Sequence, residues 1–85
     1  MEYKFFGILY RNGSVTASNS VYMWVIDRVL TLEERETLRL DHVRTYDNLS
    51  GEQGDKVGRE VDRYKGPEDA LIQKIDKILG TDQPA

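Results

Sequence analysis

Cysteine is absent from the chain, and histidine occurs once. Without cysteine the protein can form neither a disulfide framework nor a thiolate zinc site, which are the usual reinforcements of small secreted domains. A single histidine leaves only carboxylates as further metal ligands. We therefore predict no metal, no cofactor and a cytoplasmic location.

The one histidine, His42, directly follows Asp41. Neighbours in a helix or a strand point in different directions, so Asp41 is badly placed to orient the imidazole of a general base. No nucleophile-elbow pattern is present to supply an activated serine. We predict that the chain is not an enzyme and has no catalytic residue.

Long hydrophobic runs are also missing, since no segment approaches the roughly 20 apolar residues of a membrane-spanning helix. The first residues, MEYKFFGILYRNGS, lack the charged, apolar and small-residue order of a signal peptide. We expect a soluble intracellular protein with no membrane partner.

Neither sign of charge dominates, because 15 acidic and 12 basic residues are mixed along the chain and leave a formal net charge of −3. Such a surface has no broad field to attract DNA phosphates or an anionic membrane, so nucleic acid is a disfavoured partner. The length allows one small domain with a thin core. We place it at residues 1–80, with a frayed tail at 81–85, and expect a partner protein or a homodimer interface to contribute to its stability.

Aromatic and β-branched residues are concentrated in YKFFGILYR, which runs into Asn12-Gly13, the strongest short signal for a β-hairpin. A two-residue loop at Asn12-Gly13 would place Arg11 opposite Ser14. Gly7, in the middle of the first strand, predicts a bulge or a close approach by another element.

The segment VYMWVIDRVL is ambiguous, because it fits a helical stripe and is also rich in β-branched and aromatic residues. Thr31-Leu32-Glu33-Glu34 forms a capping box, and an N-cap residue has an extended backbone. A helix that begins at Thr31 argues against one that passes through it. We therefore predict a strand over 21–29.

The helix opened by Thr31 has a poor apolar stripe as far as Tyr46. The alternative is a single turn over 32–36 followed by a strand, because TLRLDHVRTY also alternates. We favour the helix.

Residues 47–58 are rich in Gly, Asp, Asn and Ser, which predicts a flexible loop. Their spacing matches neither a phosphate-binding loop, nor a dinucleotide fingerprint, nor a calcium loop. We predict a short helix after this loop. Pro67 then marks the start of a further helix, and Gly80 caps its end.

These elements predict an α+β fold: a small antiparallel sheet built on an N-terminal β-hairpin, with or without a third strand, and two or three helices packed on one face. By elimination, we expect a non-enzymatic domain that binds another protein, as an inhibitor, adaptor or accessory subunit. Small acidic domains of this kind include virus-encoded inhibitors of host enzymes or defence complexes, an analogy of size and charge alone.

The residues left over once a core is assigned are aromatic anchors and exposed charges, and such residues are typical of protein interfaces. The predicted contact residues are Tyr22, Trp24, Glu33, Glu34, Glu36, Asp47, Glu52, Asp55 and Lys56. Two alternatives remain: a nucleic-acid-binding module that uses Lys56, Arg59 and Arg63, and a self-associating dimer that binds a ligand.

Overall fold

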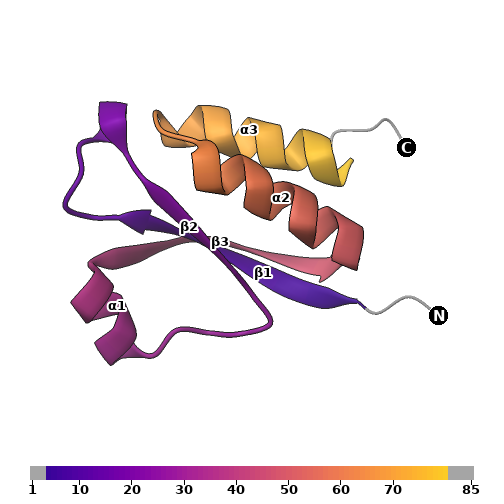
Figure 1. Ribbon diagram of the computed structural model, residues 1–85, viewed down its shortest axis with the longest axis horizontal. Helices are drawn as coiled ribbons and strands as arrows, with labels where there is room; N and C mark the ends of the chain where they lie inside the picture. The colour runs from indigo at the N-terminus through magenta and orange to yellow at the C-terminus, as the bar shows by residue number, and fades with distance from the viewer. Residues whose placement is uncertain (1–3, 81–85) are drawn as a thin grey trace.

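The computed structural model describes residues 4–80, so the predicted tail at 81–85 lies outside the described residues. An antiparallel sheet of three strands in the order β2-β1-β3 forms the centre of the fold (Figure 1). In chain order the elements are β1 Phe5–Asn12, a 3-10 turn at Ala17–Asn19, β2 Tyr22–Ile26, α1 Leu32–Leu38, β3 Leu40–Leu49, α2 Gly51–Arg63 and α3 Glu68–Leu79. The predicted α+β class is confirmed.

The predicted hairpin is wrong, because no strand directly follows Asn12-Gly13 and β1 pairs instead with β2. Arg11 lies opposite Tyr22 and not opposite Ser14. The Asn12 side chain accepts hydrogen bonds from the backbone N–H (3.0 Å) and hydroxyl of Ser14. This local turn directs the chain into a longer connection that contains the 3-10 turn, so β1 meets β2 only after nine intervening residues, 13–21.

The segment over 21–29 is a strand, as predicted, although β2 is shorter and ends at Ile26. Asp27 follows with a positive φ of 59°, a conformation that breaks the strand. The predicted capping box is also present: the Thr31 side chain accepts from the Glu34 amide, and the Glu34 side chain accepts from the Thr31 amide.

The helix that Thr31 opens does not continue to Tyr46, so the favoured prediction is wrong. Its alternative, a short helix followed by a strand, is correct in kind, although α1 extends beyond 32–36 to Leu38. Arg39 ends α1 in the left-handed conformation (φ 56°) and donates its backbone N–H to Arg35 and Glu36 carbonyls. The chain then enters β3, which pairs with β1 from Asn12 opposite Leu40 to Phe5 opposite Leu49. A continued helix would leave this edge of β1 without a hydrogen-bonded neighbour.

The predicted loop over 47–58 is also wrong, because β3 runs to Leu49 and α2 begins directly after it. Ser50 and Gln53 form a second capping box, with side-chain to backbone distances of 3.2 and 3.0 Å. Gly54 is buried against the sheet, where a Cβ atom would lie 2.9 Å from Ile26 Cδ1. The glycine therefore allows the helix to approach the sheet closely, and it does not mark a loop.

The last helix, α3, begins after Pro67 and ends at Gly80 (φ 72°), as predicted. With α2 it covers one face of the sheet (Figure 1). The larger core cluster lies between these layers and contains Leu9, Tyr22, Tyr46, Leu49, Val57, Val61, Leu71 and Ile75.

The opposite face of the sheet carries a second, smaller cluster of Ile8, Tyr10, Leu30 and Leu40. The Tyr10 hydroxyl accepts a hydrogen bond from the Leu30 amide at 3.3 Å, which holds the chain that leads into α1 against this face. The helix α1 thus lies on the other side of the sheet from α2 and α3, next to β3 (Figure 1).

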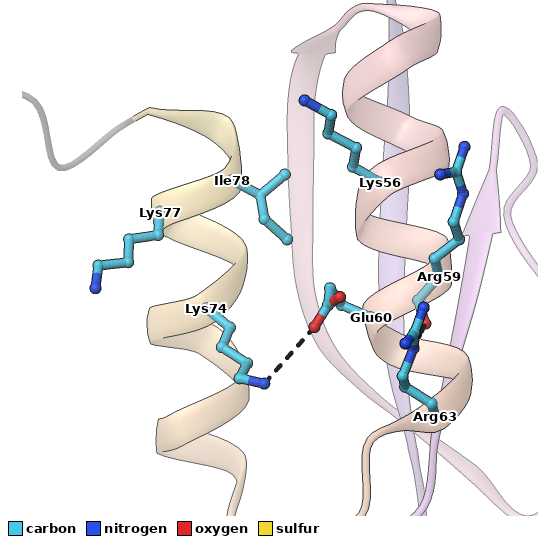
Figure 2. Close-up of a pocket in the computed structure, with 7 residues that line it drawn as sticks. All are labelled: Lys56, Arg59, Glu60, Arg63, Lys74, Lys77 and Ile78. Atoms are coloured by element: carbon cyan, nitrogen blue, oxygen red, sulfur yellow. Dashed lines mark hydrogen bonds and ion pairs between the residues drawn. The ribbon is translucent and has the colours of Figure 1, made fainter.

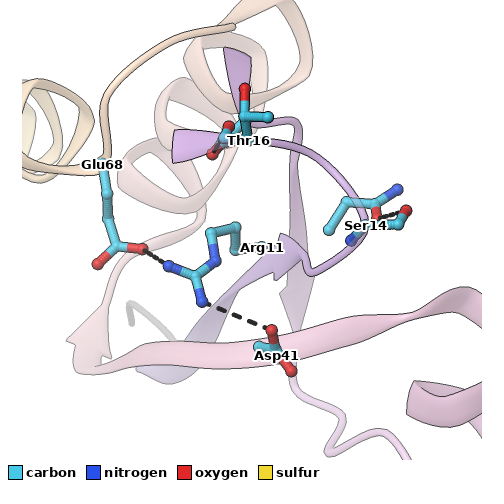
Figure 3. Close-up of polar contacts among 7 residues, drawn as sticks. Arg11, Ser14, Thr16, Asp41 and Glu68 are labelled. Carbon is cyan, nitrogen blue, oxygen red and sulfur yellow. Dashed lines mark hydrogen bonds and ion pairs between the residues drawn. The ribbon is translucent and has the colours of Figure 1, made fainter. Parts of the chain in front are cut away.

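Arg11 links α3 to the sheet (Figure 3). Its guanidinium lies 3.2 Å from Glu68 Oε1 at the start of α3 and 3.5 Å from Asp41 Oδ2 on β3. Three elements distant in sequence are therefore joined at one half-buried cation.

Candidate functional site

Tyr22, one of the two predicted aromatic anchors, belongs to the core. Its side chain is 5% exposed, its hydroxyl donates to the Gly66 carbonyl at 3.2 Å, and its ring packs on Tyr64 with centroids 5.9 Å apart. Burial raises the pKa of the Tyr22 hydroxyl, because the phenolate would lose its hydration. The side chain is not available to a partner of the folded domain.

Trp24, the other predicted anchor, lies half-buried under α2. Its Nε1 donates to the Gly54 carbonyl at 3.1 Å, and its ring packs on Tyr46 with centroids 5.9 Å apart. Gly7 on the neighbouring strand leaves room for the indole, as the predicted close approach required. Tyr22 and Trp24 therefore both pack between the sheet and the helices that cover it.

The three acids predicted as contacts all lie on α1, but they differ in their surroundings. Glu33 and Glu36 are exposed. Glu34 closes the capping box and forms an ion pair with Arg28. The hydrogen bond from the Thr31 backbone, aided by Arg28, lowers the pKa of the Glu34 carboxyl. Glu34 thus holds the helix in place, while the other two acids face solvent.

The short helix α1 buries none of its seven residues. Leu32 is 65% exposed and Leu38 is 49% exposed, and Val29, just before the helix, is 67% exposed. On a helix, Leu32, Arg35 and Leu38 are successive i+3 neighbours, which places the two leucines on either side of the half-buried Arg35. Sequence reasoning did not name these apolar residues as contacts, because it expected a strand as far as Val29 and a longer helix after Thr31.

The predicted contacts of the supposed loop do not join this surface. Asp47 is exposed on β3, and Glu52, Asp55 and Lys56 are exposed on α2, across the sheet from α1. Lys56 and Glu52 form an ion pair of 3.3 Å within the helix. The predicted residues therefore divide between two sides of the molecule.

A groove of about 360 Å³ lies between α2 and α3 (Figure 2). It is lined by Lys56, Arg59, Glu60, Arg63, Lys74, Lys77 and Ile78. Ile78 and the ion pair between Lys74 and Glu60 (3.6 Å) lie between the helices. Lys56 extends from α2 toward α3, whereas Lys77 points away from α2 (Figure 2). Sequence reasoning named the three cations of α2. It missed Lys74 and Lys77, because only the packing of the two helices brings them near the first three.

His42 is exposed, and its Nε2 lies 2.9 Å from the Thr45 hydroxyl. Its ring meets the Tyr10 ring edge-on, with centroids 6.2 Å apart. Among residues 4–80, no group of three or more histidine or carboxylate side chains is placed to hold a metal ion. Within the same residues, no helix is long and apolar enough to cross a membrane.

No protein-family model, curated protein or solved structure matches this chain. Functional inference therefore rests on the two exposed features described above: the apolar residues of α1 and the basic groove between α2 and α3.

Proposed function

We propose that the chain is a non-enzymatic protein-binding domain that docks on its partner through α1 and the segment before it. The contact residues of this docking surface are Val29, Leu32 and Leu38, flanked by Glu33 and Glu36. Such a domain acts as an inhibitor, an adaptor or an accessory subunit. The observation that carries the proposal is a helix that buries none of its own residues while exposing both of its leucines.

The energetics of a short helix support this proposal. An isolated helix of fewer than about 12 residues is marginal in water, and helices in proteins gain most of their stability from packing. Here α1 has no buried residue, and the capping box and the ion pair between Arg28 and Glu34 stabilise its first turn. Because the helix is held without using its leucines, they remain available to a partner.

The exposed apolar area also favours binding. Full burial of a Val or Leu side chain is worth about 1.5–3 kcal/mol. Since Val29, Leu32 and Leu38 still expose roughly half to two thirds of their surface, a partner that covers them would gain about half to two thirds of that amount at each. The partner surface is apolar, with basic groups opposite Glu33 and Glu36.

The test compares affinity capture by the wild-type chain and by a Leu32→Ala/Leu38→Ala variant from nuclease-treated lysate washed at high salt. Alanine favours the helix and removes only the exposed side chains, so the fold should be retained. Val21→Ala is the control, because Val21 is an exposed apolar residue on the edge of the sheet.

We expect one protein to be retained near stoichiometry by the wild type and by the control, and its affinity to fall about tenfold or more, about 1.4 kcal/mol, in the double variant. The charge reversals Glu33→Lys and Glu36→Lys should also weaken this complex. Equal capture by all variants would exclude α1 as the docking surface, and recovery of nothing but the chain itself would indicate self-association.

A further inference from the structure

We propose that the groove between α2 and α3 is a second docking site, which binds an acidic segment of a partner protein. This site lies across the sheet from α1 and does not depend on the docking surface proposed above. With two such surfaces the domain would connect two partners, which favours the adaptor role over simple inhibition.

The charge of the groove is opposite to that of the rest of the molecule. Its seven lining residues include five cations and one acid, a formal charge of +4. The whole chain carries −3, so the residues outside the groove carry −7. Like charges in such a cluster repel one another, and a bound anion would reduce this electrostatic repulsion.

Lys56 pairs with Glu52 and Lys74 with Glu60, whereas the other three cations, Arg59, Arg63 and Lys77, form no ion pair within the described part of the chain. Arg63 uses its Nε to donate to the Arg59 carbonyl at 3.3 Å, which leaves the other N–H groups of its guanidinium for a ligand. A guanidinium can donate two parallel hydrogen bonds to one carboxylate or to one phosphate group. The unpaired cations therefore suit an anionic ligand, and an acidic segment of a protein meets this requirement.

The shape of the groove fits a short peptide. Lys56 and Arg63 are seven residues apart on α2, which corresponds to about 10 Å along the helix axis. About three residues of an extended chain cover the same length. Ile78 between the helices offers one apolar contact to such a segment (Figure 2). The segment that fits best thus combines several carboxylates with an apolar side chain.

Nucleic acid fits this groove less well. Proteins that bind single strands stack bases on exposed aromatic rings, and no aromatic residue lines the groove. Tyr64, at the end of α2, donates its hydroxyl to the Pro67 carbonyl at 2.7 Å and packs on Tyr22. A long polyanion would also meet the acidic remainder of the surface, whereas a short acidic segment would not.

The experiment measures fluorescence anisotropy of a labelled peptide of glutamate and leucine titrated with the purified chain. A glutamine and leucine peptide of the same length controls for charge. A labelled single-stranded oligonucleotide tests nucleic acid as the alternative ligand. The variants are Arg59→Glu and Arg63→Glu. Lys65→Glu is the matched control, because Lys65 is an exposed cation that does not line the groove. Circular dichroism verifies that each variant is folded.

We expect saturable binding of the acidic peptide that weakens with salt, an affinity loss of about tenfold in each arginine variant, and little change in the Lys65→Glu control. The Leu32→Ala/Leu38→Ala variant should bind this peptide like the wild type, so failure of one surface is distinguishable from failure of the other. No saturable binding of the acidic peptide, equal losses in all charge variants, or tighter binding of the oligonucleotide would each overturn the proposal.

Discussion

Gly7→Ala should destabilise this domain by forcing a side chain into the space of the only tryptophan. A Cβ atom at position 7 would lie 2.2 Å from Trp24 Cζ2 and 2.4 Å from Cη2. The indole cannot yield easily, because it packs on Tyr46 on one side and its Nε1 is bonded to Gly54 on α2. The ring must move, and its contacts with the helix must change with it.

The size of the effect follows from three contributions. Overpacking a core by one methyl group costs about 1–3 kcal/mol. Loss of the Trp24 hydrogen bond adds about 0.5–1.5 kcal/mol. Alanine is favoured over glycine in a strand by roughly 0.5–1 kcal/mol, which offsets part of the cost. We expect a net loss of about 2 kcal/mol, which corresponds to a fall in Tm of roughly 8–16 °C for a domain of this size.

Urea denaturation followed by Trp24 fluorescence measures this change directly. Gly51→Ala is the control, since no atom lies within 4 Å of a Cβ placed there, and its expected effect is neutral or stabilising. A Trp24→Leu background should remove most of the cost of Gly7→Ala. Because Trp24 is the only tryptophan of the chain, unfolding in that background is followed by circular dichroism. Equal stability of the Gly7→Ala and Gly51→Ala variants, or an unchanged cost of Gly7→Ala without the indole, would show that Trp24 does not limit the space at position 7.

Three further predictions concern caps and buried hydroxyls. Ser50→Ala should cost about 1 kcal/mol in urea denaturation, because it removes the N-cap of α2, while Ser50→Asp should retain most of the stability. Tyr46→Phe should be neutral or stabilising by up to about 1 kcal/mol, because the buried Tyr46 hydroxyl has no hydrogen-bond partner among residues 4–80; a clear loss in Tm would contradict this. The pKa of Glu34 is lowered from 4.5 by the Thr31 backbone, so its support of α1 is complete above pH 4.5 and is lost as pH falls through the lower folded pKa. NMR titration of the Thr31 and Glu34 amides should show this loss, and Glu34→Gln should abolish it.

Local signals in the sequence were sufficient to predict those features that depend on one or two residues, such as the end of a helix. The capping box at Thr31, the proline and glycine that flank α3, and the close approach at Gly7 were all predicted from their own residues and found in place. The caps depend on backbone angles that neighbouring residues largely determine. The close approach depends on the glycine itself, because it has no side chain.

Where the prediction failed, distant contacts decided between conformations that the local sequence allows about equally. Residues 40–49 form a strand that pairs with β1 over most of its length, and these hydrogen bonds to a distant segment favour the strand over a helix. Residues 51–58 are helical because Ser50 and Gln53 cap the start of α2 and the Val57 face of the helix packs in the core, while Gly54 lets the helix lie close to the sheet.

Tertiary packing also explains why the candidate sites could be predicted only in part. The sequence identified charged residues on α1 and α2, but it could not tell that Tyr22 is buried or that Leu32 is exposed, because exposure depends on which helices cover which face of the sheet. It also could not join Lys74 and Lys77 to the cations of α2, since residues separated by 11 to 21 positions become neighbours only when the two helices pack. Sequence alone determined the class of the fold and several element ends, while tertiary packing decided which side chains remain available for binding.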